Sequence, residues 1–282
     1  MSETVVAPQT TMGPVELVVA DLERSLGYYR ETIGLAVLEQ TAGRARLGVG
    51  DRVLLVLDEV AGARPAPGST GLFHFALLVP ERADLAGWLG HAARDRVALT
   101  GMSDHAVSEA LYLRDPDHHG IEIYRDRERD TWEGRVAELM TTKPLDVDGL
   151  LAEPAAREPF AGLPDGTVMG HVHLCVADVA PTVEFYERVL GFGVMARLGP
   201  SAAFFGAGGY HHHVGANTWE SAGGRPAPDG SASLRSATVV LPGPAERDAV
   251  LARVEATGAA VSEAEAGPSF ADPSGNVLVL AA

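Results

Sequence analysis

The sequence contains one cysteine, few basic residues and no long hydrophobic run. Because Cys175 is its single thiol, the chain can form no internal disulfide, which suits a reducing cytoplasm. Lys and Arg number 22 against 38 Asp and Glu, and the formal net charge of −16 argues against nucleic acid or an anionic membrane as a partner. No stretch of about 18 uninterrupted apolar residues is present, so we expect a cytoplasmic protein without a membrane span.

The N-terminal residues MSETVVAPQTT lack the basic segment and the apolar core of a signal peptide, and we expect them to form a frayed leader. What the chain does have is length and apolar content. Its 282 residues, 46% of them hydrophobic, are enough for one large domain or two ordinary ones with a real core. The composition leaves the oligomeric state open, a homo-oligomer included.

A sequence repeat occurs at residues 15–35 and 172–192. In each copy an alternating, β-branched segment passes through Ala-Asp into apolar residues spaced i, i+4, i+7 and i+11, which predicts a strand followed by an amphipathic helix. An aspartate can cap the start of the helix, and a glycine can end it. The residues in these roles are Asp21 and Asp178 at the start, and Gly34 and Gly191 at the end.

Two fainter copies, 71–89 and 233–251, run from a strand through proline into a helical pattern. They are followed by matching tails, YLRDPDHHGIEIY at 112–124 and SFADPSGNVLVLA at 269–281, in which an Asp-Pro turn precedes an alternating strand. The pattern predicts an α+β fold made of four strand–helix–three-strand (βαβββ) units.

The four units group into two modules, residues 12–125 and residues 166–282. The residues between them, 126–165, are charged, contain proline and show little periodicity. We interpret this segment as a partly ordered linker.

Several motifs carry a resemblance to a known family, namely GLFHFALLVP, SDHAVSEALYLRDPD, GIEIY, GTVMGHVHL and GGYHHHVGANTW. Over residues 12–281 the chain resembles the catechol 2,3-dioxygenase-like branch of the vicinal oxygen chelate superfamily. This superfamily also includes glyoxalase I, fosfomycin-resistance proteins and bleomycin-binding proteins. The resemblance implies paired βαβββ units, each pair curling a mixed sheet around a U-shaped cavity that holds a metal.

Metal ligands of this superfamily recur at set places in the first and last strands of a unit, so the repeat can be searched position by position. Of the six positions that the spacing from the Asp, Pro and Asp-Pro signals defines, three keep a ligand side chain and three have lost it. The kept residues are His74, Glu122 and His171, and the lost positions are Pro14, Ser236 and Val279.

The kept residues come from the second and third units, and the lost positions from the first and fourth. If the second unit pairs with the third and the first with the fourth, one cavity has a complete ligand set and the other has none. If the first unit pairs with the second, each half keeps only part of a set. We therefore expect the swapped pairing.

Two histidines and one carboxylate that leave further positions open are the arrangement of non-haem Fe(II) oxygenases. Cleavage of a catechol ring needs those positions, because the substrate binds through two oxygens and O2 takes another. Glyoxalase I relatives typically use four protein ligands, and only three are visible here. We expect Fe(II) as the cofactor, with Mn(II) or another divalent metal as the alternative.

Ring cleavage also needs an acid–base group, for which histidine is the natural candidate. The run of three histidines at 211–213 leads into a predicted strand, on which His212 faces away from His211 and His213. We choose His212 as the acid–base residue and His211 as its alternative. The resemblance implies that Tyr112, ten residues before Glu122, hydrogen-bonds the substrate.

Three further histidines, His105, His173 and His213, are candidates for contact with the substrate, His173 because it shares a strand face with His171. By contrast, we expect His118 and His119 to be exposed, since they lie in a turn beside a glycine.

The predicted function is a metal-dependent extradiol-type dioxygenase that cleaves a catecholic or hydroquinone-like ring, with a small aromatic compound and O2 as its substrates. One alternative is a non-catalytic binding or resistance protein, which would commonly lack the ligand set. Another is a glyoxalase-like lyase, isomerase or thiol transferase, which metal identity and O2 consumption would distinguish.

Overall fold

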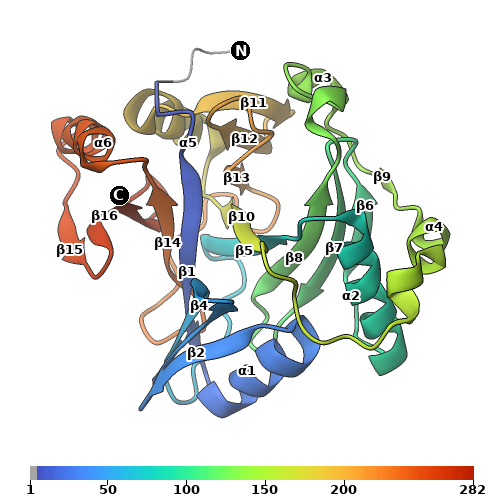
Figure 1. Ribbon diagram of the computed structural model, residues 1–282. Coiled ribbons are helices and arrows are strands. Elements are labelled where there is room, and N and C mark those ends of the chain that lie inside the picture. Colours follow the sequence, from blue (N-terminus) through green and yellow to red (C-terminus); the bar gives the residue numbers. More distant parts are fainter. Residues whose placement is uncertain (1–4) are drawn as a thin grey trace.

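The computed structural model describes residues 5–282 and consists of two mixed sheets with helices on the outside (Figure 1). In chain order the elements are β1 Thr11–Val19, α1 Leu22–Tyr28, η1 Tyr29–Ile33, β2 Ala36–Thr41, β3 Arg44–Val49, β4 Arg52–Glu59, β5 Gly71–Leu78, α2 Arg82–Asp95, β6 Gly101–Asp104, β7 Ser108–Arg114, β8 Gly120–Asp126, η2 Arg129–Thr131, α3 Val136–Leu139, β9 Lys143–Pro144, α4 Val147–Ala152, η3 Pro154–Arg157, β10 Val168–Cys175, α5 Val179–Glu184, η4 Phe185–Leu190, β11 Gly193–Leu198, β12 Ala202–Gly206, β13 Val214–Asn217, β14 Leu234–Val240, α6 Pro244–Ala256, β15 Ser262–Ala264, β16 Gly267–Ala271 and β17 Val277–Ala281.

The helix that follows β1 begins and ends where the sequence predicts. The side chain of Asp21 accepts a hydrogen bond from the backbone N–H of Arg24, which satisfies a donor that the helix itself cannot pair. Gly34 ends the helix with a φ of 93°, a left-handed conformation that glycine adopts without steric penalty. The helix after β10 repeats both features. In each copy the last turn is a π-helix, η1 or η4, which the sequence period did not reveal.

The two sheets pair the units in the swapped way. The eight-stranded sheet has the order β15-β16-β17-β14-β1-β4-β3-β2, so it joins the first and fourth units through β1 and β14. The nine-stranded sheet has the order β11-β12-β13-β10-β5-β8-β7-β6-β9, so it joins the third and second units through β10 and β5. The expected pairing of units is therefore confirmed.

Buried tyrosines tie together the units that the sheets separate. The hydroxyl of Tyr29 in the first unit donates to Asp115 Oδ2 in the second at 2.9 Å. The repeat places the same contact between Tyr186 of the third unit and Asp272 of the fourth, at 3.3 Å. In both cases the other carboxylate oxygen accepts backbone N–H groups of the Asp-Pro turn. Consecutive units are thus joined by these hydrogen bonds, while the sheets join units that are distant in sequence.

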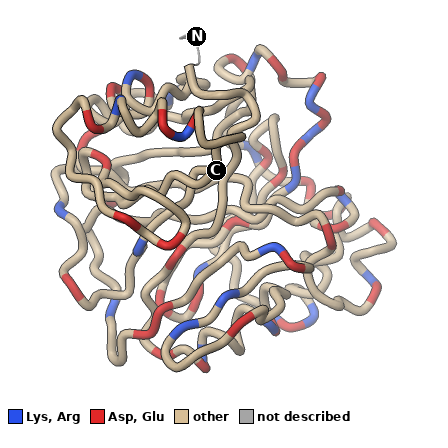
Figure 2. The backbone as a smooth tube through the Cα atoms, turned by 60° about the vertical axis from the view of Figure 1, so that its left-hand side comes forward, with Lys and Arg blue, Asp and Glu red and all other residues tan. Residues whose placement is uncertain are grey.

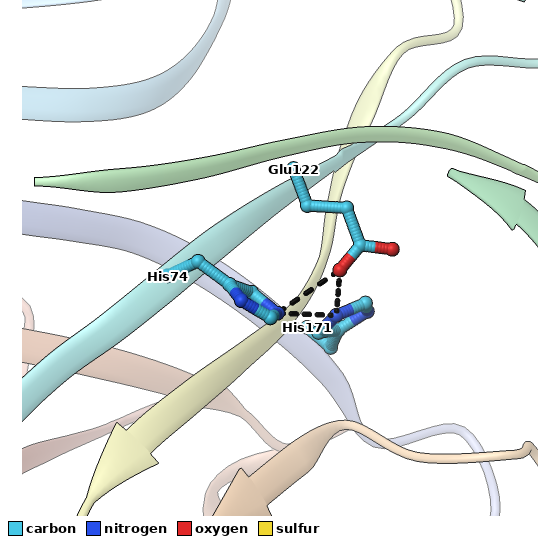
Figure 3. A group of neighbouring side chains, drawn as sticks. All are labelled: His74, Glu122 and His171. Atoms are coloured by element: carbon cyan, nitrogen blue, oxygen red, sulfur yellow. Dashed lines mark hydrogen bonds and ion pairs between the residues drawn. The ribbon is translucent and has the colours of Figure 1, made fainter. Parts of the chain in front are cut away.

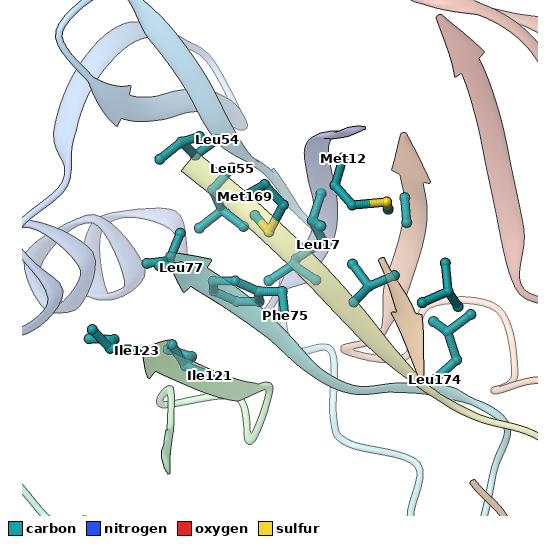
Figure 4. Packing of buried hydrophobic residues seen from close by; sticks show 14 of the residues in the cluster. Met12, Leu17, Leu54, Leu55, Phe75, Leu77, Ile121, Ile123, Met169 and Leu174 are labelled. Atoms are coloured by element: carbon teal, nitrogen blue, oxygen red, sulfur yellow. The ribbon is translucent and has the colours of Figure 1, made fainter. Parts of the chain in front are cut away.

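Side chains from both sheets form one hydrophobic core (Figure 4). Leu17 and Leu55 come from the eight-stranded sheet, and Phe75, Leu77 and Met169 from the nine-stranded sheet. All five are buried, and burial of such side chains contributes roughly 1.5–3 kcal/mol each. The core therefore fixes the two sheets against each other.

Two expectations need correction, and the interpretation of the segment 126–165 as a linker stays a prediction. Within the predicted frayed leader, Val6 and Thr10 are buried: the N–H of Val6 donates to Gly191 O and its side chain lies in the core, while residues 1–4 lie outside the described part. The segment 126–165 is ordered by short helices and buries Trp132 and Leu150. His118 is exposed as expected, but His119 is buried, because its Nε2 donates to Val18 O at 3.0 Å.

Charged residues lie mainly outside this core. In the view of Figure 2 the basic residues are interspersed among the acidic ones along the backbone. Among the helices of residues 5–282, none combines the length and the apolarity that a membrane span requires.

The hydrogen bond between Tyr29 and Asp115 gives a test of the packing between the units. In Tyr29→Phe, Asp115 Oδ2 loses its partner in a buried position, so we expect the free energy of unfolding to fall by about 1–3 kcal/mol. Tyr28→Phe is the matched control, because its hydroxyl donates to the exposed Arg114 O, and it should lose less than about 1 kcal/mol. Urea unfolding of both variants measures the difference. Equal losses would contradict the interpretation.

Candidate metal centre

Three neighbouring strands carry the predicted ligands. His171 lies on β10, His74 on β5 and Glu122 on β8, and these strands are adjacent in the order β10-β5-β8. The register places Ala76 of β5 between His171 on one side and Glu122 on the other. His74 is two residues from Ala76 and shares its face of the sheet. Because the central residue is an alanine, the three longer side chains can converge above it.

The ligand atoms of the three side chains meet at one point (Figure 3). The Nε2 atoms of His74 and His171 each lie 3.0 Å from Glu122 Oε2 and 3.3 Å from each other. All three residues are buried, with exposures of 6%, 1% and 2% for His74, His171 and Glu122. Among residues 5–282, these are the ones that form a group able to hold a metal ion.

The protonation states also suit a cation. Burial by itself raises the pKa of Glu122, but the charge and the hydrogen bond of His171, together with those of His74, outweigh it and hold the pKa well below its usual range. Burial lowers the pKa of His171 below its ordinary value. The carboxylate is therefore ionised, and the His171 ring, when neutral, keeps a lone pair for a metal.

The distances match a single divalent ion. Three ligand atoms at about 2.1 Å from one ion and at right angles to each other lie about 3 Å apart, as these do. A buried carboxylate is stable only when paired or bound to a metal, and a divalent cation among the three ligands would neutralise it. The residues present therefore fit one 2-His-1-carboxylate metal site.

The corresponding positions of the eight-stranded sheet are filled differently. Pro14 offers no ligand atom, and Ser236 and Val279 are buried with exposures of 5% and 3%. Opposite Ser236, Glu16 accepts from Arg44 at 3.0 Å in an ion pair within the same sheet. At these positions the eight-stranded sheet therefore has apolar packing and ion pairs, whereas the nine-stranded sheet has the metal ligands.

The three consecutive histidines precede a strand rather than forming part of it, since β13 begins at Val214. His212 lines the cavity beside the ligands, its ring 4.1 Å from that of His171, centroid to centroid. His211 lies behind it, with its Nδ1 2.8 Å from His212 Nδ1 and its Nε2 2.7 Å from Asp126 Oδ1. Asp126 of β8, His211 and His212 thus form a chain of hydrogen bonds that ends at the cavity.

A second chain reaches the ligands from β6 and β7. Tyr112 is directly opposite Glu122 in the β7–β8 register. Its hydroxyl lies 2.8 Å from His105 Nε2, and His105 Nδ1 lies 2.7 Å from Thr141 O. Burial, reinforced by the charge of Glu122, raises the pKa of Tyr112 well above its usual value, so the hydroxyl stays protonated.

A cavity of about 410 Å³ opens beside the three ligands. His105, Tyr112, His173 and His212 are all part of its wall. His213 is placed differently: its Nδ1 accepts from the N–H of Ala207, and its ring lies among Phe192 and Tyr210.

Sequence reasoning missed the contribution of the segment 126–165. Its residues Met140, Thr141 and Thr142 line the cavity, and the Trp132 ring lies 5.5 Å from that of His211. The charged and aperiodic composition of the segment gave no signal of this role. Asp126 was missed for the same reason, although it is the last residue of β8, the last strand of the second unit.

The family model described as Glyoxalase/Bleomycin resistance protein/Dioxygenase superfamily matches residues 11–123 and 168–280. The chain therefore belongs to this superfamily. It is 43% identical over 278 residues to a protein of Bacillus subtilis (strain 168) named Catechol-2,3-dioxygenase, a match that covers 96% of each chain.

Two solved structures share the fold at low sequence identity. A putative dioxygenase from Bacillus subtilis subsp. subtilis str. 168 has a TM-score of 0.66 at 16% identity, covering 100% of this chain and 86% of that one. Glyoxalase I from Zea mays has a TM-score of 0.59 at 17% identity, covering 96% and 92%. At these identities, the two structural similarities support the fold and nothing about function.

The site predicts one divalent metal per chain. His74→Ala, Glu122→Ala and His171→Ala each remove one of three ligands, so each variant should lose most of its metal, measured by elemental analysis after dialysis. Ser236→Ala is the matched control in the eight-stranded sheet and should keep one metal per chain. Full occupancy in all three ligand variants, or two metals in the wild type, would contradict the assignment.

Proposed function

We propose that the protein is an extradiol dioxygenase that opens a catecholic ring with O2, using Fe(II) or, as the alternative, Mn(II). The observation that carries the proposal is the buried 2-His-1-carboxylate group beside a largely apolar cavity. The near full-length similarity to a protein named Catechol-2,3-dioxygenase supports the same activity. The metal would supply a Lewis acid and a template that brings the substrate oxygens and O2 together.

The hydrogen bonds of His211 determine which nitrogen of His212 is free. Asp126 is a carboxylate acceptor, so His211 Nε2 carries a hydrogen and donates to it. In a neutral His211 the Nδ1 is then an acceptor, and His212 Nδ1–H is its donor. This leaves the lone pair on His212 Nε2, which has no hydrogen-bond partner among residues 5–282. We propose that this atom takes a proton from the catechol.

His105 and Tyr112 would hold the opposite side of the substrate. Because His105 Nδ1–H donates to Thr141 O, its Nε2 accepts from the hydroxyl of Tyr112. The oxygen of Tyr112 keeps its lone pairs, with which it can accept a hydrogen bond from a substrate hydroxyl. We propose substrate contacts for Tyr112, His105 and His173, each of which lines the cavity.

The two alternatives are less well supported. A binding or resistance protein has no need for a buried, ionised glutamate between two histidines, which is costly without a cation. A glyoxalase-like enzyme would typically place a fourth ligand in the group, and the group formed within residues 5–282 has three members.

Oxygen consumption tests the activity. Protein purified without O2 and loaded with Fe(II) should consume O2 when given catechol and form a ring-opened product with the extended absorption of a conjugated semialdehyde. The same protein loaded with Zn(II), which has no redox chemistry, is the control. Conversion of a 2-oxoaldehyde–thiol adduct without O2 uptake would instead favour the glyoxalase-like alternative.

The acid–base role of His212 can be separated from metal binding. His212→Ala should keep its metal but lower kcat by about 10²–10⁴-fold, because a general acid–base group typically contributes that much. His213→Ala, whose side chain points to Phe192 and Tyr210, is the matched control and should keep most of its activity. His211→Ala should fall between them, because it removes the partner that orients His212. If all three variants turn over catechol at the wild-type rate, the acid–base role lies elsewhere.

A further inference from the structure

We propose that the substrate is a neutral catechol carrying an apolar substituent of about the size of a ring, and that Trp219 is the residue that selects for this substituent. The proposal rests on the proposed dioxygenase function and adds the part of the substrate that lies away from the metal. Cavity size, the composition of one wall and the charge at the rim carry the argument.

The cavity is larger than a single ring requires. A cavity of roughly 150 Å³ is enough to bind benzene, whereas the cavity beside the three ligands measures about 410 Å³. A catechol bound at the metal would therefore leave space for at least one more ring. That space has a mostly apolar lining, to which Leu113, Ile121, Leu198 and Phe204 contribute.

An aromatic wall leads from the ligand His74 to the outer end of the cavity. The ring of His74 lies 5.0 Å from that of His173, and the ring of His173 lies 5.5 Å from that of Trp219. The ring of Phe73 packs against the rings of both His173 and Trp219, with centroid-to-centroid distances of 5.3 Å in each case. Phe73 reaches the wall through a β-bulge, since β10 pairs His173 with His74 and the next residue with Leu72.

Trp219 is exposed but held in a fixed orientation. It is 49% exposed, and Leu198 at the same cavity is 40% exposed, whereas the other tryptophans, Trp88 and Trp132, are buried. The indole N–H of Trp219 donates to Ser201 Oγ at 3.3 Å, and its backbone N–H donates to Asn217 Oδ1. A pre-oriented aromatic face in contact with water favours the binding of an apolar group, because burying it removes that surface from water at little entropic cost.

The charges at the rim do not favour an acidic substituent. Among the described residues of the lining, Arg114 is the one with a permanent positive charge. Its guanidinium already donates to His118 O and lies 3.7 Å from Glu220 Oε1, so a substrate carboxylate would approach a carboxylate of the protein. The net charge of −16 opposes an anionic substrate as well.

Competing catechols test the proposal. We expect the Fe(II)-loaded wild type to show a kcat/KM for 3-phenylcatechol or 4-phenylcatechol at least tenfold above that for 3,4-dihydroxyphenylacetate. In Trp219→Ala the ratio of kcat/KM for the preferred phenylcatechol to that for catechol should fall by about 10- to 100-fold, the discrimination that an apolar pocket supplies. Met102→Ala is the matched control. It is 41% exposed but lies on the face of β6 opposite Gly101 and Ser103, which line the cavity, so the ratio should not change.

Anaerobic calorimetry separates this inference from the proposed function. If no catechol supports O2 uptake, the dioxygenase proposal fails, but tighter binding of the phenylcatechol to the wild type than to Trp219→Ala would still support the aromatic subsite. Two outcomes with an enzyme that turns over catechol would overturn the subsite proposal. One is a higher kcat/KM for 3,4-dihydroxyphenylacetate than for both phenylcatechols. The other is an equal ratio of kcat/KM for the phenylcatechol to that for catechol in Trp219→Ala and the wild type.

Discussion

The antiparallel pairing of β5 with β10 is the contact on which the metal centre depends. This pairing places His171 beside Ala76, and the parallel pairing of β5 with β8 places Glu122 on the other side of the same residue. A slip of one residue in either ladder would turn a ligand to the opposite face of the sheet. The bulge at Gly170 belongs to the same register, and a side chain at this position would collide with the hydroxyl of Tyr124. The strand register and this close approach of the backbone thus fix where the three ligands lie.

Electrostatics explains why the surroundings of the site are so aromatic and so rich in histidine. Burial of a carboxylate such as Glu122 is unfavourable, and a divalent ion bound by it and by the two histidines would offset that penalty. Further charged side chains near the ion would compete with its substrate. Burial keeps His173 and His212 neutral by lowering the pKa of each well below its ordinary value. Asp126, the acidic partner of the histidine loop, hydrogen-bonds His211 and does not line the cavity.

The two sheets are built from the same repeated unit, but only the nine-stranded sheet carries the metal ligands. Both contain the capped helix, the left-handed glycine and the tyrosine that hydrogen-bonds an Asp-Pro turn. In the eight-stranded sheet the ligand positions hold proline, serine and valine, and apolar packing stabilises this sheet as a scaffold. Consecutive units remain joined through the tyrosine–aspartate contacts, which connect the scaffold sheet to the sheet that carries the ligands.

The local sequence determined the elements, and counting along the repeat determined the ligands. Asp21, Gly34 and the alternation of β1 act through neighbours in the chain, so their pattern predicts strand, helix start and helix end. His74, Glu122 and His171 were found because each occupies a repeated position, and a swapped pairing was the arrangement that makes one complete set. These predictions concern short-range physics or internal symmetry, both of which a single sequence contains.

Only the tertiary structure decided what surrounds the metal. Asp126 and Thr141 contact His211 and His105 across 85 and 36 residues of chain, and no local pattern encodes contacts at such separations. The burial of His119 follows likewise from a hydrogen bond to Val18 O, which is 101 residues away. That His212 lines the cavity while His211 and His213 do not follows from the conformation of an irregular loop, where the alternation of a strand does not apply. Local periodicity reports the backbone, whereas the pocket is made by side chains that meet only after the sheets have packed.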